Sequence, residues 1–227
     1  MCGRITFTLT RDELAEIYKI TDEMDWQPRY NIAPSQPVPV MVNTEAQQLK
    51  FFRWGLVPSW AKDPQSGYKM INARAETIDT KPSFKHCFRE QRCLVLADGF
   101  YEWKREGKRK TPYLFKVRDR KFFAFAGIWD SWKSPAGTVL YTCSIITTGP
   151  NEQMAPIHDR MPVILDKENE RIWLNPELND TEKLKQLLVP YPAVRMEAYQ
   201  VSDYVNSVKH DSIACIQPVP GQTALFG

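Results

Sequence analysis

The sequence is short of glycine and carries little net charge of either sign. It contains 10 glycines against 17 prolines, and its 30 Lys and Arg nearly balance 27 Asp and Glu, which leaves a net charge of +3. Few glycines with many prolines indicate short strands joined by stiff loops rather than long helices. A net charge this small does not identify a polyanionic partner by itself.

Further absences exclude classes of function. The sequence has no glycine-rich phosphate-binding loop of either common type, so nucleotide hydrolysis has no support. The three histidines are scattered, and His86, Cys87 and Cys93 lack the paired short spacings of a zinc site. We therefore expect no metal and no cofactor. No apolar run is long enough to cross a membrane, and no signal peptide is evident.

The number of cysteines indicates whether the protein is expected in a reducing or an oxidising compartment. There are five cysteines, an odd number, which favours free thiols in a reducing, cytoplasmic environment. Four of them lie in apolar contexts that are typical of core thiols, namely Cys87, Cys93, Cys143 and Cys215.

Charge is distributed unevenly along the chain. From Glu102 to Lys121, nine Lys and Arg oppose three acids, whereas from Thr10 to Asp25 six acids oppose two basic residues. Such polarity can steer a polyanion onto one face of a protein. A solvated hairpin with protective lysines explains the basic segment equally well.

Local patterns predict the elements. Thr10 to Glu13 form a capping box at a helix start, Asp180 or Thr181 can cap a second helix, and a helical turn is expected around 171–174. Short β-prone runs predict strands at 4–9, 37–42, 49–54, 93–97, 113–118, 121–128, 139–147, 162–166 and 194–201. Asp119 and Arg120 predict a hairpin between two of these strands. We expect one domain over residues 1–227 with an α+β, mainly antiparallel β fold.

The start of the chain has a chemical property that no internal residue can offer. Removal of Met1 would leave Cys2 with a free α-amine, and thus a 1,2-aminothiol. The amine condenses with an aldehyde to an imine, and the neighbouring thiol then closes a five-membered thiazolidine. A frayed terminus is the simpler interpretation of Cys2 alone. The strand predicted from Arg4 onward favours a fixed terminus instead.

Several polar residues stand in apolar surroundings. Asn72, Arg74 and Glu76 alternate with small or apolar residues, so they would share one face of an extended segment. Glu102 lies between two aromatic residues, where partial burial would raise its pKa. His158 comes directly before a predicted strand. Each has a structural explanation when taken singly, as a turn residue, a salt bridge, a surface charge or a histidine paired with a neighbouring acid.

Taken in order, short motifs resemble one family. They read Met-Cys-Gly-Arg, Tyr-Asn-Ile-Ala-Pro, Trp-Gly-Leu-Val-Pro-Ser-Trp, Asn-Ala-Arg-Ala-Glu-Thr, Asp-Gly-Phe-Tyr-Glu-Trp and His-Asp-Arg-Met-Pro-Val, from residue 2 to about 165. The ordered set resembles the SOS-response-associated peptidase (SRAP) family, whose members are also called abasic-site processing proteins. The resemblance implies that family's fold, with many short strands in a barrel-like or bifurcated sheet and a few peripheral helices.

The resemblance also implies roles for individual residues. Cys2 would be the nucleophile, Asn72 would orient the amine, and Glu102 and His158 would move protons during sugar ring opening and imine formation. Arg4, Arg74 and Arg160 would contact phosphates, and Asn31 would belong to the same DNA-binding surface. Stacking on or wedging against bases would fall to Trp103 and Pro34, and also to Trp54 or Trp60.

The function implied is a covalent thiazolidine link between Cys2 and an abasic site in single-stranded DNA. The link would shield the lesion during the response to DNA damage. An abasic nucleotide offers no base edge, so recognition must come from phosphates and from stacking of neighbouring bases. Junctions of single- and double-stranded DNA are a further candidate target. We expect a monomer, associated with the nucleoid of a bacterial or phage-derived host, and no membrane partner.

Two other readings remain open. The first is a thiol peptidase or amidohydrolase with an N-terminal Cys nucleophile, including autocatalytic removal of Met1. Such a mechanism does not call for the arginines and tryptophans of the motifs. The second is a non-enzymatic DNA-binding module, which would form no link that survives denaturation.

Overall fold

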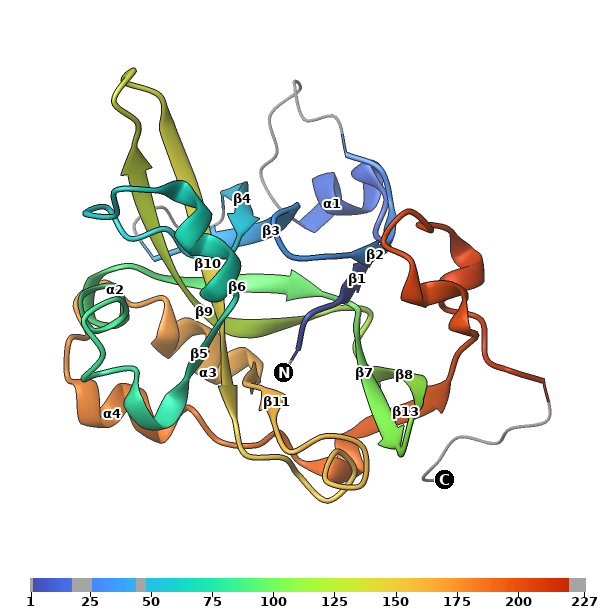
Figure 1. The fold of residues 1–227 in the computed structure, drawn as a ribbon. Coiled ribbons are helices and arrows are strands. Elements are labelled where there is room, and N and C mark those ends of the chain that lie inside the picture. The colour runs from blue at the N-terminus through green and yellow to red at the C-terminus, as the bar shows by residue number, and fades with distance from the viewer. Residues whose placement is uncertain (1, 18–25, 44–47, 221–227) are drawn as a thin grey trace.

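The protein is built from two β-sheets with short helices outside them (Figure 1). The computed structural model describes residues 2–17, 26–43 and 48–220. The sheets share one hydrophobic core, in which Phe100 and Phe115 from one sheet lie beside Phe125 from the other. Within the described part of the chain, no helix is long and apolar enough to cross a membrane.

The first sheet has five strands and contains the start of the chain. Its order is β13 (Met196–Gln200), β8 (Arg109–Val117), β7 (Gly99–Glu106), β1 (Ile5–Phe7) and β2 (Arg29–Ile32). All neighbouring strands in it are antiparallel. The short strand β1 therefore has a partner on each side.

The second sheet closes on itself. It contains β3 (Pro37–Val42), β4 (Leu49–Trp54), β5 (Asn72–Arg74), β6 (Arg92–Ala97), β9 (Phe123–Lys133), β10 (Val139–Thr148), β11 (Met161–Pro162) and β12 (Ile164–Leu165). Pairing runs from β4 through β3, β6, β9 and β10, and β10 pairs with β4 again. This ring is a five-stranded barrel, and β5, β11 and β12 extend it. The pairings of β10 with β4 and β5 are parallel and the others antiparallel, so the predicted α+β, mainly antiparallel β fold with a barrel-like sheet is confirmed.

The α-helices that the structure describes are α1 (Arg11–Ile17), α2 (Lys85–Glu90), α3 (Lys167–Trp173) and α4 (Thr181–Gln186), with 3-10 turns at Pro64–Lys69, Ala75–Thr77, Ala193–Arg195, Asp203–Asn206 and Ile213–Cys215. Of these helices, α1 and α4 start where the sequence predicts, α3 begins earlier than the turn expected around 171–174, and α2 was not predicted. Thr10 and Glu13 form the reciprocal capping box of α1. Asp180 caps α4 by accepting from the backbone N–H groups of Glu182 and Lys183.

The predicted hairpin between 113–118 and 121–128 is wrong. Strand β8 lies in the five-stranded sheet and β9 in the barrel, so Asp119 and Arg120 carry the chain from one sheet to the other. The true hairpin is β7–β8, in which Glu106 pairs with Arg109 around a two-residue turn. Gly107 in that turn has φ of +60°, a left-handed conformation that glycine adopts without strain.

Asp98 fixes strand β1 at the place where the two sheets meet. It lies between β6 and β7, and its carboxylate accepts hydrogen bonds from the hydroxyl groups of Thr6 and Thr8. It also accepts from the backbone N–H of Thr8, while its own N–H donates to the carbonyl of Thr6. Because both sides of the carboxylate are used, the position of β1 is tied to the corner where the barrel passes into the five-stranded sheet.

Candidate active site

Cys2 lies just before β1, which begins at Ile5, and it is fully buried. Ile5 opposes Phe100 on one side and Ile32 on the other, and the N–H of Tyr101 donates to the carbonyl of Arg4 at 2.9 Å. These backbone contacts hold the residues that follow Cys2. Burial raises the pKa of the Cys2 thiol well above its usual range, and the negative charge of Glu102 raises it further.

Asn72 contacts the backbone of Cys2 from the barrel. It is the first residue of β5, which pairs in parallel with β10 at Ile145. Its side-chain Nδ2 donates to the Cys2 carbonyl oxygen at 2.7 Å. The Oδ1 atom of the same amide is buried and has no hydrogen-bond partner among the residues that the structure describes. A buried acceptor of this kind costs free energy unless a ligand or water pairs with it.

Glu102 and His158 face each other at the pocket. Glu102 is buried on β7, and His158 comes from the loop before β11; Nε2 of the ring lies 3.9 Å from Oε2 of the carboxylate. Nδ1 of the ring accepts from the N–H of Arg160 at 3.0 Å and also lies 2.9 Å from Oδ1 of Asp159.

Burial acts on both titrating groups. It raises the pKa of Glu102 to about 7, and it lowers the pKa of His158 below its ordinary value of 6.5. Glu102 thus titrates close to neutral pH, whereas burial favours the neutral form of His158. A pair of this kind can both donate and accept a proton during one reaction.

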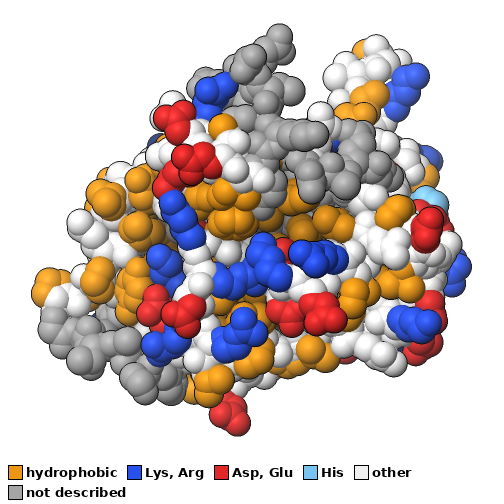
Figure 2. Space-filling model, turned by 180° about the vertical axis from the view of Figure 1, so that it is seen from behind, with side chains coloured by type: hydrophobic (Ala, Val, Ile, Leu, Met, Phe, Trp, Pro, Cys, Tyr) orange, Lys and Arg blue, Asp and Glu red, His pale blue; other side chains and the backbone are white. Residues whose placement is uncertain are grey.

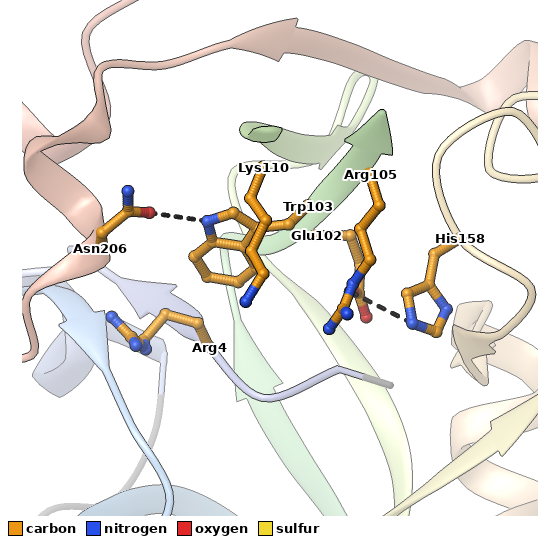
Figure 3. Close-up of a pocket in the computed structure, with 7 residues that line it drawn as sticks. All are labelled: Arg4, Glu102, Trp103, Arg105, Lys110, His158 and Asn206. Carbon is orange, nitrogen blue, oxygen red and sulfur yellow. Dashed lines mark hydrogen bonds and ion pairs between the residues drawn. The ribbon is translucent and has the colours of Figure 1, made fainter. Parts of the chain in front are cut away.

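These residues border an open pocket of about 470 Å³. Its walls come from β7, β8, the N-terminal segment and two loops, as Figure 3 shows. The lining residues are Arg4, Glu102, Trp103, Arg105, Lys110, His158 and Asn206. Four cationic or titratable basic side chains therefore surround a single acid, which favours an anionic ligand.

Arg4 and Asn31 hold the loop that forms one wall of the pocket. Arg4 Nη1 donates to Asn31 Oδ1 at 2.7 Å and to the Val205 carbonyl at 2.9 Å. Asn31 is fully buried, and its Nδ2 donates to the carbonyls of Val205, Ser207 and His210. The Asn31 amide is thus used inside the protein, and its contact with DNA stays a prediction. Arg4 lines the pocket, and its phosphate contact stays a prediction.

The two tryptophans of the segment at 54–60 lie in opposite environments. Trp54 is fully buried and its Nε1 donates to the carbonyl of Ile71 at 2.9 Å, and its stacking on a base stays a prediction. Trp60 is 66% exposed and presents a free ring. Trp103 lines the pocket, where its Nε1 donates to Asn206 Oδ1 at 2.7 Å. Pro34 is half-buried beside Ser35, which has φ of 72°.

Arg160 and Arg74 differ in what holds them. Both terminal nitrogens of Arg160 pair with the carboxylate of Glu76, and Nη2 also donates to the Thr147 carbonyl at 2.7 Å. Arg74 is exposed at the end of β5. The extended segment stops there, because Glu76 lies in the 3-10 turn Ala75–Thr77 rather than on the strand.

Sequence reasoning missed three residues of the pocket, namely Arg105, Lys110 and Asn206. The excess of positive charge from Glu102 to Lys121 was the available signal for two of them. It did not identify them, because the hairpin was placed at Asp119 instead of Gly107. The opposing acidic segment lies partly outside the described residues, at 18–25.

The face of the molecule seen from behind carries mixed charge. Lys and Arg side chains lie across its middle, with Asp and Glu side chains close to them and apolar side chains between (Figure 2). Such a mixture lowers the net field on that face. In the described part of the chain, no cluster of three or more His, Cys, Asp or Glu could hold a metal ion, and all five cysteines are free and buried.

A family model described as SOS response associated peptidase (SRAP) matches residues 1–208. The chain belongs to the SRAP family. It is 50% identical over 222 residues to the abasic site processing protein YoqW of Bacillus subtilis, covering 96% of this chain and 99% of that one. It is 31% identical to the abasic site processing protein HMCES of Xenopus tropicalis, covering 96% of this chain and 78% of the relative.

Solved structures agree with the SRAP assignment. A crystal structure of a protein from Bacteroides thetaiotaomicron superposes with a TM-score of 0.86 at 30% sequence identity, covering 96% of this chain and 100% of the other. A phage-related protein from Bordetella bronchiseptica superposes with a TM-score of 0.68 at 29% identity.

Proposed function

We propose that this protein processes abasic sites in single-stranded DNA by linking them covalently to Cys2. The proposal requires that Met1 is removed, so that Cys2 carries the α-amine. The curated relatives named above are abasic site processing proteins. The observation that carries the proposal for this chain is the hydrogen bond from Asn72 to the Cys2 carbonyl beside the Glu102–His158 pair.

The reaction has two steps and releases one water. The α-amine adds to the C1′ aldehyde of the open-chain sugar, and the carbinolamine loses water to give an imine. The Cys2 thiol then adds across the C=N bond, with sulfur going to carbon and the thiol proton going to nitrogen. The ring that closes is a thiazolidine, and the thiol proton needs an acceptor on the way because burial keeps the thiol protonated.

The neighbouring residues supply the proton transfers. A carboxyl group with a pKa of about 7 is partly protonated at neutral pH, so Glu102 can protonate the sugar oxygen and later accept a proton. His158 provides the second transfer group. Asn72 keeps the Cys2 backbone in place, and its unpaired Oδ1 provides an acceptor for the amine or for a sugar hydroxyl.

Recognition of the DNA follows from the same surface. The pocket offers positive charge from arginines and lysine, and the half-buried ring of Trp103 together with the exposed ring of Trp60 can stack on bases. We therefore expect weak dependence on sequence and strong dependence on salt. The proposed chemistry needs no cofactor, and its biological result would be a shielded lesion in the response to DNA damage.

The test is a denaturing gel of purified protein with an oligonucleotide that carries one abasic site, accompanied by the intact mass of the free protein. We expect a shifted band from a protein that lacks Met1. The band should be lost in Cys2→Ala, and also with a tetrahydrofuran analogue of the lesion, which has no aldehyde. A correctly processed protein that forms no band would exclude covalent capture.

That negative result would favour amide hydrolysis, in which the Cys2 thiol attacks a carbonyl and the α-amine acts as its base. The two functions differ in what they consume. Turnover of peptide or amide substrates, lost in Cys2→Ala and unaffected by abasic DNA, would support the hydrolase.

A further inference from the structure

Two cationic side chains face each other directly on the β7–β8 hairpin. Arg105 and Lys110 are opposite partners in the strand register, and both are exposed. Figure 3 shows both side chains extending from the hairpin in the same direction, over the space between Trp103 and His158. Like charges placed opposite each other on one face of a sheet destabilise it.

Within residues 2–17, 26–43 and 48–220, no ion pair with an acid offsets this repulsion. Among the described residues, neither Arg105 nor Lys110 has a hydrogen-bond or ion-pair partner. The adjacent Lys104 differs, because its Nζ lies 2.8 Å from Glu106 Oε1. Two cations therefore lie side by side at the pocket without a counter-ion. An anionic ligand bound to both would stabilise this arrangement.

Two of the three arginines expected at phosphates, Arg4 and Arg160, are already engaged, and the third, Arg74, is not among the residues that line the pocket. The guanidinium of Arg4 donates to Asn31 and to the Val205 carbonyl, and that of Arg160 is paired with Glu76. A phosphate must displace or share these contacts. Arg105 and Lys110 have no such contacts to give up, so within the pocket they can bind a phosphate at a lower cost in free energy.

The pair also lies close to the reacting groups. The positive charge of Arg105 is one of the smaller causes that lower the pKa of His158, after burial. A ligand bound between Arg105 and Lys110 would therefore be within a short distance of the Glu102–His158 pair. For a DNA strand whose abasic sugar lies at Cys2, the nearest anion is the phosphodiester that adjoins this sugar.

We propose that Arg105 and Lys110 together bind the phosphodiester next to the abasic sugar and so hold the lesion at Cys2. This inference rests on the proposed function, since it takes abasic single-stranded DNA as the ligand. The two side chains position the strand and take no part in the chemistry. Arg105 can approach two phosphate oxygens with its planar fork, while Lys110 supplies a point charge from the other strand of the hairpin.

The first experiment measures non-covalent binding, in protein that carries Cys2→Ala, to an oligonucleotide with a tetrahydrofuran lesion. Affinity is followed between about 50 and 300 mM KCl for the parent, for the two single variants Arg105→Gln and Lys110→Gln and their double variant, and for Lys104→Gln, a control that removes one positive charge from the same strand as Arg105. The slope of log K against log salt should become shallower by about 0.7 in the double variant, the value for one phosphate of a single strand. Lys104→Gln should keep the parent slope.

A second experiment identifies the phosphate. Uncharged methylphosphonate linkages are placed singly on the 5′ and the 3′ side of the lesion. At one of these positions the neutral linkage should weaken binding of the parent about tenfold and leave the double variant unchanged. Equal weakening of parent and double variant at both positions, or an unaltered salt slope, would overturn the proposal. Near-native circular dichroism and melting temperature confirm that the variants are folded.

The outcomes separate this inference from the proposed function. Binding is read without covalent chemistry, so a wild-type protein that forms no crosslink overturns the proposed function and leaves the phosphate site standing. A wild type that crosslinks normally, combined with a double variant of parental salt slope, overturns the phosphate site alone.

Discussion

Arg160 is held by Glu76 through two parallel contacts, with its Nη1 at 2.6 Å from one carboxylate oxygen and its Nη2 at 3.0 Å from the other. This geometry matches the way a guanidinium binds a phosphate. Glu76 thus occupies the position that a DNA phosphate would need. It lies on an exposed turn directly after Arg74, so the carboxylate is accessible to solvent and to a competing anion.

We therefore predict that Glu76→Gln strengthens non-covalent binding to single-stranded DNA. Removing one exposed ion pair changes the free energy by up to about 1 kcal/mol, which corresponds to up to about fivefold in Kd. The measurement is fluorescence anisotropy at low salt. Glu152→Gln, at an exposed acid outside the site, serves as the control. Weaker binding in Glu76→Gln would instead assign Glu76 the task of orienting Arg160.

Glu102 gives a prediction about stability and pH. Its folded pKa of about 7 lies above the ordinary value of 4.5, so between these two values the folded state binds more protons than the unfolded state. The contribution of Glu102 to the free energy of unfolding is fully present below pH 4.5, and it is lost as the pH rises through about 7. Glutamine resembles the protonated form, so Glu102→Gln should be more stable than wild type at pH 8, by on the order of 3 kcal/mol.

The check is urea unfolding of both proteins at pH 4.5 and at pH 8. At pH 4.5 the two free energies of unfolding should agree. A gap of the same size at both pH values would show that the substitution acts through packing rather than through the proton.

Asn72→Ala should slow the crosslinking reaction while leaving DNA affinity intact. Without the hydrogen bond to its carbonyl, Cys2 loses a fixed position, and a displacement of about 1 Å costs on the order of a hundredfold in rate. Single-turnover rates at saturating DNA measure the effect. Asn179→Ala removes the same side chain from an exposed position and should react like wild type. A loss confined to Kd would place Asn72 in binding instead.

Asn31→Ala should behave as a stability variant. Four hydrogen bonds join this buried amide to Arg4 and to the loop at 205–210, and removing the amide leaves carbonyls without partners. We expect a loss of about 2–4 kcal/mol in the free energy of unfolding. Chemical denaturation measures it. At a temperature where the variant is fully folded, its salt slope for DNA binding should equal that of wild type, and a changed slope would support Asn31 as a DNA contact.

Substitutions of Trp54 and Trp60 should distinguish a tryptophan that packs in the core from one that stacks on a DNA base. Trp54→Ala should destabilise the protein by about 3–5 kcal/mol because its ring is buried in the barrel. Trp60→Ala should leave the melting temperature nearly unchanged and weaken DNA binding by about 1–3 kcal/mol, the range for one base stacked on an aromatic ring. Wild-type affinity in folded Trp60→Ala would remove Trp60 from the DNA-binding surface.

The bounds of some strands and the caps of two helices could be predicted from the sequence, whereas the pairing of strands far apart in the chain could not. Strands β3 and β4 have the predicted bounds, and the caps at Thr10 and Asp180 form as expected, since each depends on neighbours within a few residues. Which strand pairs with β8 depends on the sheet to which β8 belongs, and that is decided by contacts far away in the sequence. Asp119 and Arg120 are suitable turn residues, but the chain there crosses between the sheets, so the predicted hairpin was wrong.

The same distinction applies to the site. The motifs identified Cys2, Asn72, Glu102 and His158, and the fold brings them together. Their roles stay predictions. The burial of Asn31 and Trp54 was not readable from the sequence, because the carbonyls that bind Asn31 come from about 174 to 179 positions further along the chain. The pairing of Arg105 with Lys110 likewise required the register of the hairpin.

The place of β1 in the middle of a sheet sets an order of events during translation. Ile5 and Thr6 leave the ribosome before their partners Phe100 and Gly99, which are made about 95 residues later. At roughly 5–20 residues per second, the aminothiol of a processed nascent chain stays exposed for about 5–20 seconds before strand β7 emerges. Metabolic aldehydes could cap Cys2 in that interval, so the fraction of competent protein would depend on the speed of synthesis as well as on the finished fold.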